Sequence, residues 1–153
     1  MQLAEQMRKM ANDCRRQNIK IECFELGLKV VIATNAVFPI SAIEQRLAWA
    51  GVPVTEFDYD LVTSYKNMHS AKPNSTYYTE ILAKIDCVPE TAVMVGDSWE
   101  NDIVPAKEAG LYTYWINEDN PGEPPDSKLI NGYGSLKEFH ALLADGWLNS
   151  LTH

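Results

Sequence analysis

Apolar residues along the chain alternate between short uninterrupted runs and longer segments with helical spacing. Four runs have the length expected of buried strands: Val30–Ala33, Tyr59–Thr63, Ala92–Val95 and Leu111–Ile116. Helix-length segments with apolar stripes follow the first three runs, over Pro39–Gly51, over Pro73–Ile85 and up to Ala109–Gly110. Strands that alternate with helices predict a parallel sheet covered on both faces. The expected fold class is therefore α/β, a three-layer, Rossmann-like, doubly wound parallel sheet.

The ends of the chain lie outside this regular alternation. Leu3–Ala11 and Leu136–Leu143 carry apolar residues at helical spacing and predict a first and a last helix. Ile19–Phe24 alternates for only a few residues, which indicates either a short strand or the tail of an irregular helix. On this pattern we divide the chain into an N-terminal helical segment, residues 1–26, and a core domain, residues 27–153.

Composition and charge exclude several classes of protein. The 153 residues suit one domain, and an apolar content of 46% is typical of a globular protein. The net charge of −8 argues against nucleic acid as a partner, because binding to its backbone requires clustered Lys and Arg. No apolar run is long enough to cross a membrane or to act as a secretion signal, so we expect a cytoplasmic protein. Three widely spaced cysteines disfavour a disulfide framework and a zinc site: Cys14, Cys23 and Cys87.

Polar residues that can bind an anion follow the first two predicted strands. In open α/β sheets, ligands bind beyond the carboxyl ends of the strands. Thr34–Asn35 follows a strand and precedes a helix, so a hydroxyl and free backbone N–H groups are available there. Lys72 directly precedes Pro73, which places its ammonium near the start of the next helix. Together these residues can hold a phosphate.

A pair of carboxylates follows the third predicted strand. Asp97 ends this strand and Asp102 comes about one helical turn later, so both side chains can face one crevice. A cation that prefers oxygen ligands, such as Mg²⁺, would suit such a crevice. Each segment taken alone also has a structural interpretation, as a turn, a helix cap or a solvated loop. Their order and spacing favour the chemical interpretation.

The order of these segments resembles that of the haloacid dehalogenase-like (HAD) hydrolases. Residues 30–35, 71–73 and 96–103 are similar to the second, third and fourth motifs of that family. The resemblance extends from about Gly27 to Ile116. It implies a magnesium-dependent phosphatase that acts on a small phosphate monoester through an aspartyl-phosphate.

The resemblance also implies roles for individual residues at the phosphate. Thr34, together with Asn35, would hydrogen-bond the transferring phosphoryl group, and Lys72 would neutralise its charge. Such a site is physically reasonable because phosphoryl transfer depends mainly on positioning and on charge stabilisation. Thr34 and Lys72 are thus candidate catalytic residues.

By the same resemblance, the segment after the third strand would form the metal-binding side of the site. Asp97 would ligate Mg²⁺. Asp102 would be a further catalytic residue that contacts either the metal shell or Lys72. Ser98 and Asn101 would be supporting residues.

The first motif of the family, Asp-x-Asp at the end of the central strand, has no counterpart before Thr34. Asp13 lies in a polar helical stretch without an apolar strand in front of it. Asp58-Tyr59-Asp60 is an Asp-x-Asp, but it lies downstream of Thr34 and at the start of a strand, where a polar strand entry is the better interpretation. The chain alone is therefore expected to be nearly inactive.

The missing motif would also leave a gap in the sheet. In this family the missing strand lies between the strands that bear Thr34 and Asp97, so backbone groups on both sides would lack partners. Three candidates can fill the gap: Ile19–Phe24, a strand from a second copy, or a separate complementing segment of the same gene product. The family's cap domain is also largely absent, and residues 1–26 would be its remnant.

Two functions stay open on this basis. The first is the core of a phosphatase that needs a complementing segment, with a small phosphorylated substrate as its ligand. The second is a non-catalytic HAD-like pseudoenzyme that binds a protein partner. A phosphoacceptor receiver domain is disfavoured, because its acidic residues precede the Thr and Lys, whereas Asp97 and Asp102 come last here.

The remaining histidine and tryptophan residues have simpler interpretations. His69 lies in the loop after the second predicted strand and is expected to be solvated. Trp99 can border the crevice. The other tryptophans lie on apolar stripes and are expected to pack in the core: Trp49, Trp115 and Trp147.

Overall fold

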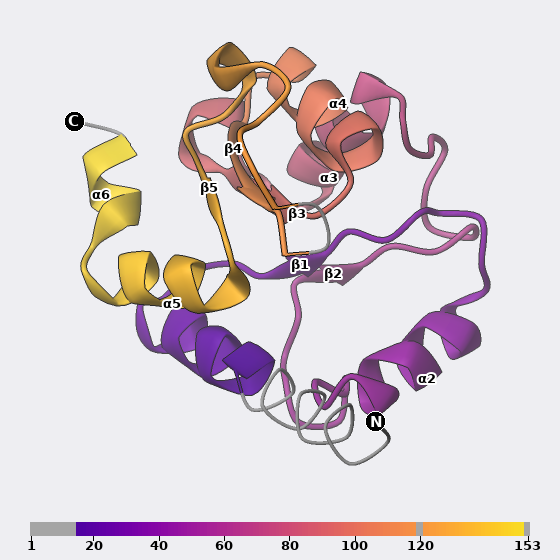
Figure 1. Ribbon diagram of the computed structural model, residues 1–153. Helices are drawn as coiled ribbons and strands as arrows, with labels where there is room; N and C mark the ends of the chain where they lie inside the picture. Colours follow the sequence, from indigo (N-terminus) through magenta and orange to yellow (C-terminus); the bar gives the residue numbers. More distant parts are fainter. Residues whose placement is uncertain (1–14, 119–120, 152–153) are drawn as a thin grey trace, which may run out of the picture.

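The computed structural model describes residues 15–118 and 121–151 (Figure 1). The helix predicted over Leu3–Ala11 lies outside the described residues. The first described element is a helix over residues 15–25, which ends in a turn where Gly27 adopts a φ of 74°. Ile19–Phe24 is therefore helical, and it does not pair as a strand in the sheet. Of the three candidates for the sheet gap, this one is wrong.

Within the described residues, five short strands form two parallel sheets. The strands are β1 (Val31–Ile32), β2 (Leu61–Val62), β3 (Val93–Gly96), β4 (Tyr112–Ile116) and β5 (Gly132–Gly134). β1 pairs with β2 with Val31 opposite Leu61, and β4 lies between β3 and β5 with Tyr114 opposite Gly132. Every pair is parallel. The predicted α/β class is confirmed, whereas β5 was not predicted because it lacks an apolar run.

The helices begin and end close to the predicted limits. They are α2 (Ile40–Trp49), α3 (Ser75–Lys84), α4 (Val104–Glu108), α5 (Leu136–Ala144) and α6 (Trp147–Leu151). Pro39 and Asn74 are the N-caps of α2 and α3, so these helices start one and two residues later than expected. A π-helical turn over Trp99–Ile103 precedes α4. Within the described part of the chain, we find no helix that is both long and apolar enough to span a membrane.

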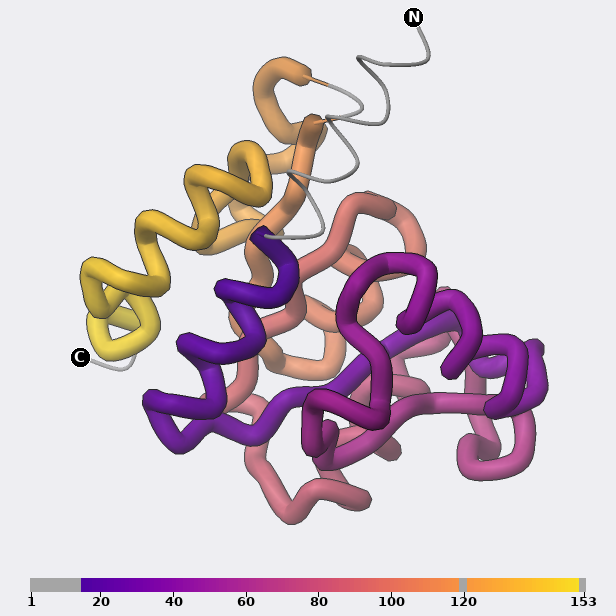
Figure 2. Tube along the Cα trace, turned by 90° about the horizontal axis from the view of Figure 1, so that it is seen from below, coloured from indigo at the N-terminus to yellow at the C-terminus, as the bar shows by residue number. Residues whose placement is uncertain are grey.

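Helices cover the strands from two sides (Figure 1). α3 and α4 supply one core, which includes Tyr77, Tyr78, Ile81 and Ala106. On the other side, the helix over residues 15–25 runs alongside α5, as Figures 1 and 2 show. Its Ile19 joins a core with Tyr114, Phe139 and Leu143, while α2 supplies a third core that includes Ile43 and Leu47. Trp49 is not part of this packing, since it is 63% exposed, and its predicted core position is wrong.

The sheet is interrupted between β1 and β3, because the described strands form no hydrogen-bonded pair there. The carbonyls of Val30 and Ile32 accept hydrogen bonds from residues of the β2 segment. Backbone groups of alternate residues point to opposite sides of a strand, so those of Val31 face away from β2. The Ala92 carbonyl likewise accepts from Tyr112 on the β4 side. Within the described residues, the edge of β1 away from β2 and the edge of β3 away from β4 are therefore both unpaired.

Helix α3 ties the two sheets together across this interruption. The Tyr77 hydroxyl donates to the Thr34 carbonyl at 2.5 Å, just beyond β1, and lies 3.0 Å from Thr63 Oγ1. The Tyr78 hydroxyl donates to the Asn101 carbonyl at 2.8 Å, just beyond β3. The two tyrosine rings are buried and meet edge to face at 5.0 Å. Two adjacent side chains therefore hold the two parts of the sheet in place.

Two buried tyrosines allow a matched test of this connection. Tyr77→Phe removes a hydroxyl with two partners, and we expect it to lower the free energy of unfolding by about 1–2 kcal/mol. The Tyr114 hydroxyl is buried without a hydrogen-bond partner among the described residues. Tyr114→Phe should therefore leave the stability unchanged or raise it. Urea unfolding of both variants measures the difference, and equal losses would contradict the bridging role of Tyr77.

Stability should also fall at alkaline pH. Burial raises the pKa of Tyr59, Tyr77 and Tyr114 to about 12, from an ordinary value of 10.0. In the unfolded chain these groups lose their protons near their ordinary pKa, while the folded chain keeps them. Between these two pH values the unfolded state binds fewer protons, so stability declines as pH rises. Urea midpoints measured from pH 9 to pH 11 should fall, and constant midpoints would refute this assignment.

Candidate active site

The predicted site residues converge at the carboxyl ends of the strands. Thr34 follows β1 by two residues, and Asp97 directly follows β3. Lys72 lies in the loop between β2 and α3. In a parallel arrangement these ends share one edge, which is where ligands bind in open α/β sheets.

Thr34 is held by a second threonine that the sequence analysis did not identify. The Thr34 N–H donates to Thr63 Oγ1 at 3.0 Å, and the Thr34 hydroxyl lies 3.3 Å from the Thr63 carbonyl. Thr63 is fully buried, whereas Thr34 is half-buried and Asn35 is exposed. The sequence did contain a signal for Thr63: it is a polar residue at the end of the second apolar run, and parallel pairing of the first two strands would place it beside Thr34. The side chain of Thr34 is therefore fixed at the carboxyl edge of the strands.

Lys72 and Asp102 form an ion pair that joins two distant segments. Lys72 Nζ lies 2.5 Å from Asp102 Oδ1, and the two side chains are only 10% and 7% exposed. The other carboxylate oxygen of Asp102 accepts the Ser98 N–H at 3.1 Å. A Cβ added to Gly96 would lie 2.3 Å from this oxygen, so glycine is required there. Of the two contacts proposed for Asp102, the structure contains the one to Lys72.

Asp97 presents its side chain to solvent. Its backbone carbonyl accepts a hydrogen bond from Trp115 Nε1 at 3.0 Å, while none of the residues that the structure describes bonds its carboxylate. The following turn is capped by Ser98, whose hydroxyl accepts the Asn101 N–H at 3.3 Å. Trp99 packs edge to face on Trp115 at 5.2 Å. The backbone around Asp97 is thus fixed, and its carboxylate is available to a ligand.

The described residues do not complete a metal site by themselves. Among them, no three His, Cys, Asp or Glu side chains are placed to share a metal ion. Asp97 and Asp102 supply two carboxylates at this edge, and Asp102 is already bonded to Lys72. Mg²⁺ requires near-octahedral oxygen coordination. Mg²⁺ usually keeps several waters and binds through one or two carboxylates together with phosphate oxygens, so the exposed Asp97 carboxylate can contribute one ligand.

The Asp-x-Asp segment at residues 58–60 serves as a strand entry. Asp60 Oδ2 accepts the Val30 N–H at 2.6 Å, at the amino ends of β1 and β2. The Tyr59 hydroxyl donates to the Val52 carbonyl at 2.8 Å. This end of the strands is opposite to the edge that carries Thr34. Asp58 and Asp60 are therefore not placed to act as nucleophiles beside Thr34.

Several known proteins are similar to this chain in sequence. A family model described as HAD-hydrolase-like matches residues 69–126. A ribulose-1,5-bisphosphate 5-phosphatase from Halopiger xanaduensis is 32% identical over 107 residues, which cover 69% of this chain and 42% of that protein. A phosphoserine phosphatase from Thermus thermophilus is 27% identical over 112 residues, which cover 73% and 43%. The chain therefore spans less than half of the length of these relatives.

Solved structures extend the likeness to the fold. The HAD hydrolase YfnB from Bacillus subtilis, solved bound to magnesium, is 26% identical with a TM-score of 0.61. The match covers 76% of this chain and 49% of that one. A HAD phosphatase from Thermococcus onnurineus has the same fold, with a TM-score of 0.64, 22% identity, and coverage of 82% and 54%. Motifs, relatives and fold agree that the chain belongs to the haloacid dehalogenase-like superfamily of hydrolases.

Proposed function

We propose that these residues form the core of a cytoplasmic, magnesium-dependent phosphatase that acts on a small phosphate monoester. The observation that carries this proposal is the buried ion pair between Lys72 and Asp102, beside the fixed Thr34 at the carboxyl edge. A lysine needs a strong reason to be held so far from water, and binding of a phosphoryl group supplies one. The relatives named as phosphatases support the same substrate class.

Thr34 and Lys72 would bind the phosphoryl group from two sides. An ammonium has three donors, and Asp102 occupies one of those of Lys72, which leaves two for phosphoryl oxygens. Thr34 would redirect its hydroxyl from the Thr63 carbonyl to the substrate, and the exposed Asn35 would add its backbone N–H. Ser98 and Asn101 would support this site by shaping the turn after Asp97.

The nucleophile would come from a strand that fills the interruption between β1 and β3. Such a strand would be parallel to both neighbours, so its carboxyl end would emerge between Thr34 and Asp97. An Asp-x-Asp at that end would face the bound phosphoryl group. A second copy of these 153 residues would bring an Asp-x-Asp only at residues 58–60, at the start of a strand and not at its end. We therefore favour a complementing segment outside these residues, with residues 27–153 as the core and residues 1–26 as a cap remnant.

The expected reaction has two displacements at phosphorus. The carboxylate of the supplied aspartate forms a bond to phosphorus, the bond to the substrate oxygen breaks, and the second aspartate of the motif protonates the leaving alcohol. Water then attacks the aspartyl-phosphate and releases inorganic phosphate. Lys72 balances charge on the equatorial oxygens during both steps. Mg²⁺, held by Asp97 and a carboxylate of the complementing segment, would supply further charge neutralisation.

The alternative is a non-catalytic module that binds a protein partner. The open backbone edges of β1 and β3 favour it, because exposed edges accept added strands. In this case a bound strand need not carry an aspartate.

Peptide complementation separates these functions. The chain alone should not hydrolyse an aryl phosphate with Mg²⁺ present. Addition of a synthetic peptide with about five apolar residues followed by Asp-x-Asp should produce hydrolysis. An Asn-x-Asn peptide, an Asp97→Asn chain and a chelator should each abolish it. If the chain alone hydrolyses the substrate and Asp97→Asn abolishes this activity, the proposal that a separate segment supplies the nucleophile is refuted. If the peptide binds without causing hydrolysis, the protein-binding module is favoured.

The ion pair can be tested through stability. Lys72→Met leaves the buried Asp102 carboxylate without its cation, and we expect a loss of about 3 kcal/mol in the free energy of unfolding. Lys72→Met combined with Asp102→Leu should recover most of this loss. Lys107→Met is the matched control, because Lys107 on α4 has no ion pair within the described regions, and its effect should stay within about 0.5 kcal/mol. Equal effects of the two Lys→Met changes would exclude a structural pair.

A further inference from the structure

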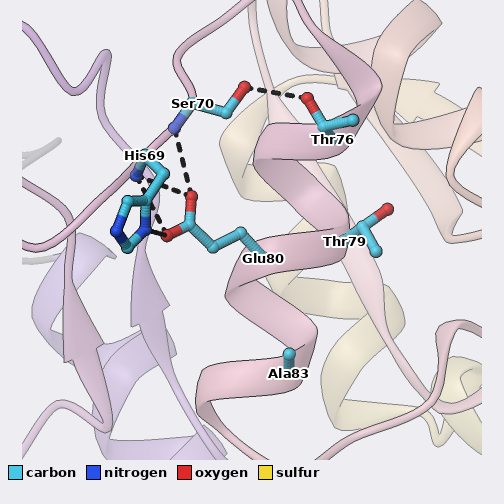
Figure 3. Close-up of a pocket in the computed structure, with 6 residues that line it drawn as sticks. All are labelled: His69, Ser70, Thr76, Thr79, Glu80 and Ala83. Atoms are coloured by element: carbon cyan, nitrogen blue, oxygen red, sulfur yellow. Dashed lines mark hydrogen bonds and ion pairs between the residues drawn. The ribbon is translucent and has the colours of Figure 1, made fainter.

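The loop that carries Lys72 is hydrogen-bonded to a carboxylate of α3. Figure 3 shows Glu80 reaching from α3 to the loop segment of His69 and Ser70. Glu80 Oε1 accepts the His69 N–H at 2.8 Å and the Ser70 N–H at 3.1 Å. Glu80 Oε2 accepts the same His69 N–H at 3.0 Å and lies 2.8 Å from His69 Nδ1. Both oxygens of Glu80 are thus used by two consecutive loop residues.

We propose that Glu80 is a positioning residue for Lys72. Only Ala71 separates Ser70 from Lys72, so the carboxylate fixes the backbone immediately before the lysine. Hydrogen bonds from N–H groups to a charged acceptor are about twice as strong as neutral ones, and two adjacent donors define the direction of the loop. This inference rests on the proposed role of Lys72 in phosphate binding, and it adds a residue outside the three motifs.

The hydrogen bonds from the loop backbone to Glu80, and not the ion pairs of Glu80, hold the loop on α3. The His69 side chain is 93% exposed, and Lys84 Nζ is 4.0 Å from Glu80. Exposed pairs of this kind contribute little to stability. The Glu80 side chain itself is only 17% exposed. Its removal from water would raise its pKa, but the hydrogen bonds from the His69 side chain and from the His69 and Ser70 amides outweigh this effect and lower the pKa. The carboxylate is therefore charged at neutral pH.

A second contact fastens the same loop to the start of α3. Ser70 Oγ lies 2.9 Å from Thr76 Oγ1. A shallow pocket beside these residues is lined by His69, Ser70, Thr76, Thr79, Glu80 and Ala83 (Figure 3). Because both Glu80 oxygens already accept backbone hydrogen bonds, this carboxylate serves as an anchor for the loop and not as a ligand group in the pocket. The prediction that His69 is solvated holds for its ring, although its backbone is held.

The test compares Glu80→Gln with two controls in the 153-residue chain. Glu44→Gln is the matched change, because Glu44 is an exposed residue of α2 whose side chain has no hydrogen bond or ion pair with any residue in the described ranges. His69→Ala removes the ring but keeps the N–H donors. Three quantities are measured: amide hydrogen exchange at residues 69 and 70, hydrogen exchange of the Lys72 ammonium by NMR, and the dissociation constant of inorganic phosphate with Mg²⁺ present.

We expect Glu80→Gln to speed both exchange processes by about tenfold or more and to weaken phosphate binding by about tenfold. Glu44→Gln should change none of the three quantities, and His69→Ala should change each by less than about threefold. A purely structural role would move the amide exchange alone. Faster amide exchange with an unchanged Lys72 ammonium and unchanged phosphate binding would therefore overturn the proposal.

The experiment also distinguishes a failure of the proposed phosphate site from a failure of the positioning role of Glu80. If the unmodified chain binds no phosphate, the phosphate site is refuted, while the Lys72 ammonium still reports on Glu80. Faster ammonium exchange in Glu80→Gln would then support the positioning role, and an unchanged rate would reject it.

Discussion

Backbone groups on both sides of a parallel strand require hydrogen-bond partners. In the described part of this structure the open edges of β1 and β3 lack such partners, and the surrounding elements are arranged around them. β1 and β3 each pair on one side only, so the sheet is not continuous between them among the described residues. Side chains take over the connection. Tyr77 and Tyr78 of α3 bond the segments just beyond β1 and β3, and the same helix carries the cores that pack against both strands. The candidate active site depends on this helix because the backbone carbonyls of Thr34 and Asn101 are bonded by its two tyrosines.

The fold was largely predictable because its signals are local. Short apolar runs predicted β1 to β4, and apolar stripes predicted α2, α3 and α5 within a few residues. β5 was missed because Gly132–Gly134 has only one large side chain, and a strand of this kind is defined by its neighbour β4. Ile19–Phe24 was ambiguous because a segment of six residues fits both the strand period and the helix period. In the structure it is a helix, whose Ile19 packs against Tyr114 and Phe139.

The site was predictable only where a motif marks it. Lys72 and Asp102 lie 30 residues apart, and the resemblance alone suggested that they meet. Thr63 and Glu80 carry no motif: Glu80 is one of 21 acidic residues, and its partners are backbone amides that every residue possesses. The hydroxyl targets of Tyr77 and Tyr78 likewise follow from the path of the chain in space. Such contacts depend on tertiary structure and leave no periodic trace in the sequence.

The contact between Gly96 and Asp102 links two positions whose variation cannot be independent. A side chain at position 96 would occupy the space of the Asp102 carboxylate, so it would require a shorter residue at position 102. That shorter residue would leave the buried Lys72 ammonium without its ion-pair partner. A substitution at position 96 is therefore blocked by Asp102, a shortening at position 102 is opposed by Lys72, and a tolerated replacement would need coordinated changes at all three positions. Such epistasis can preserve the Gly, Lys and Asp together in a lineage even after selection for turnover has ended.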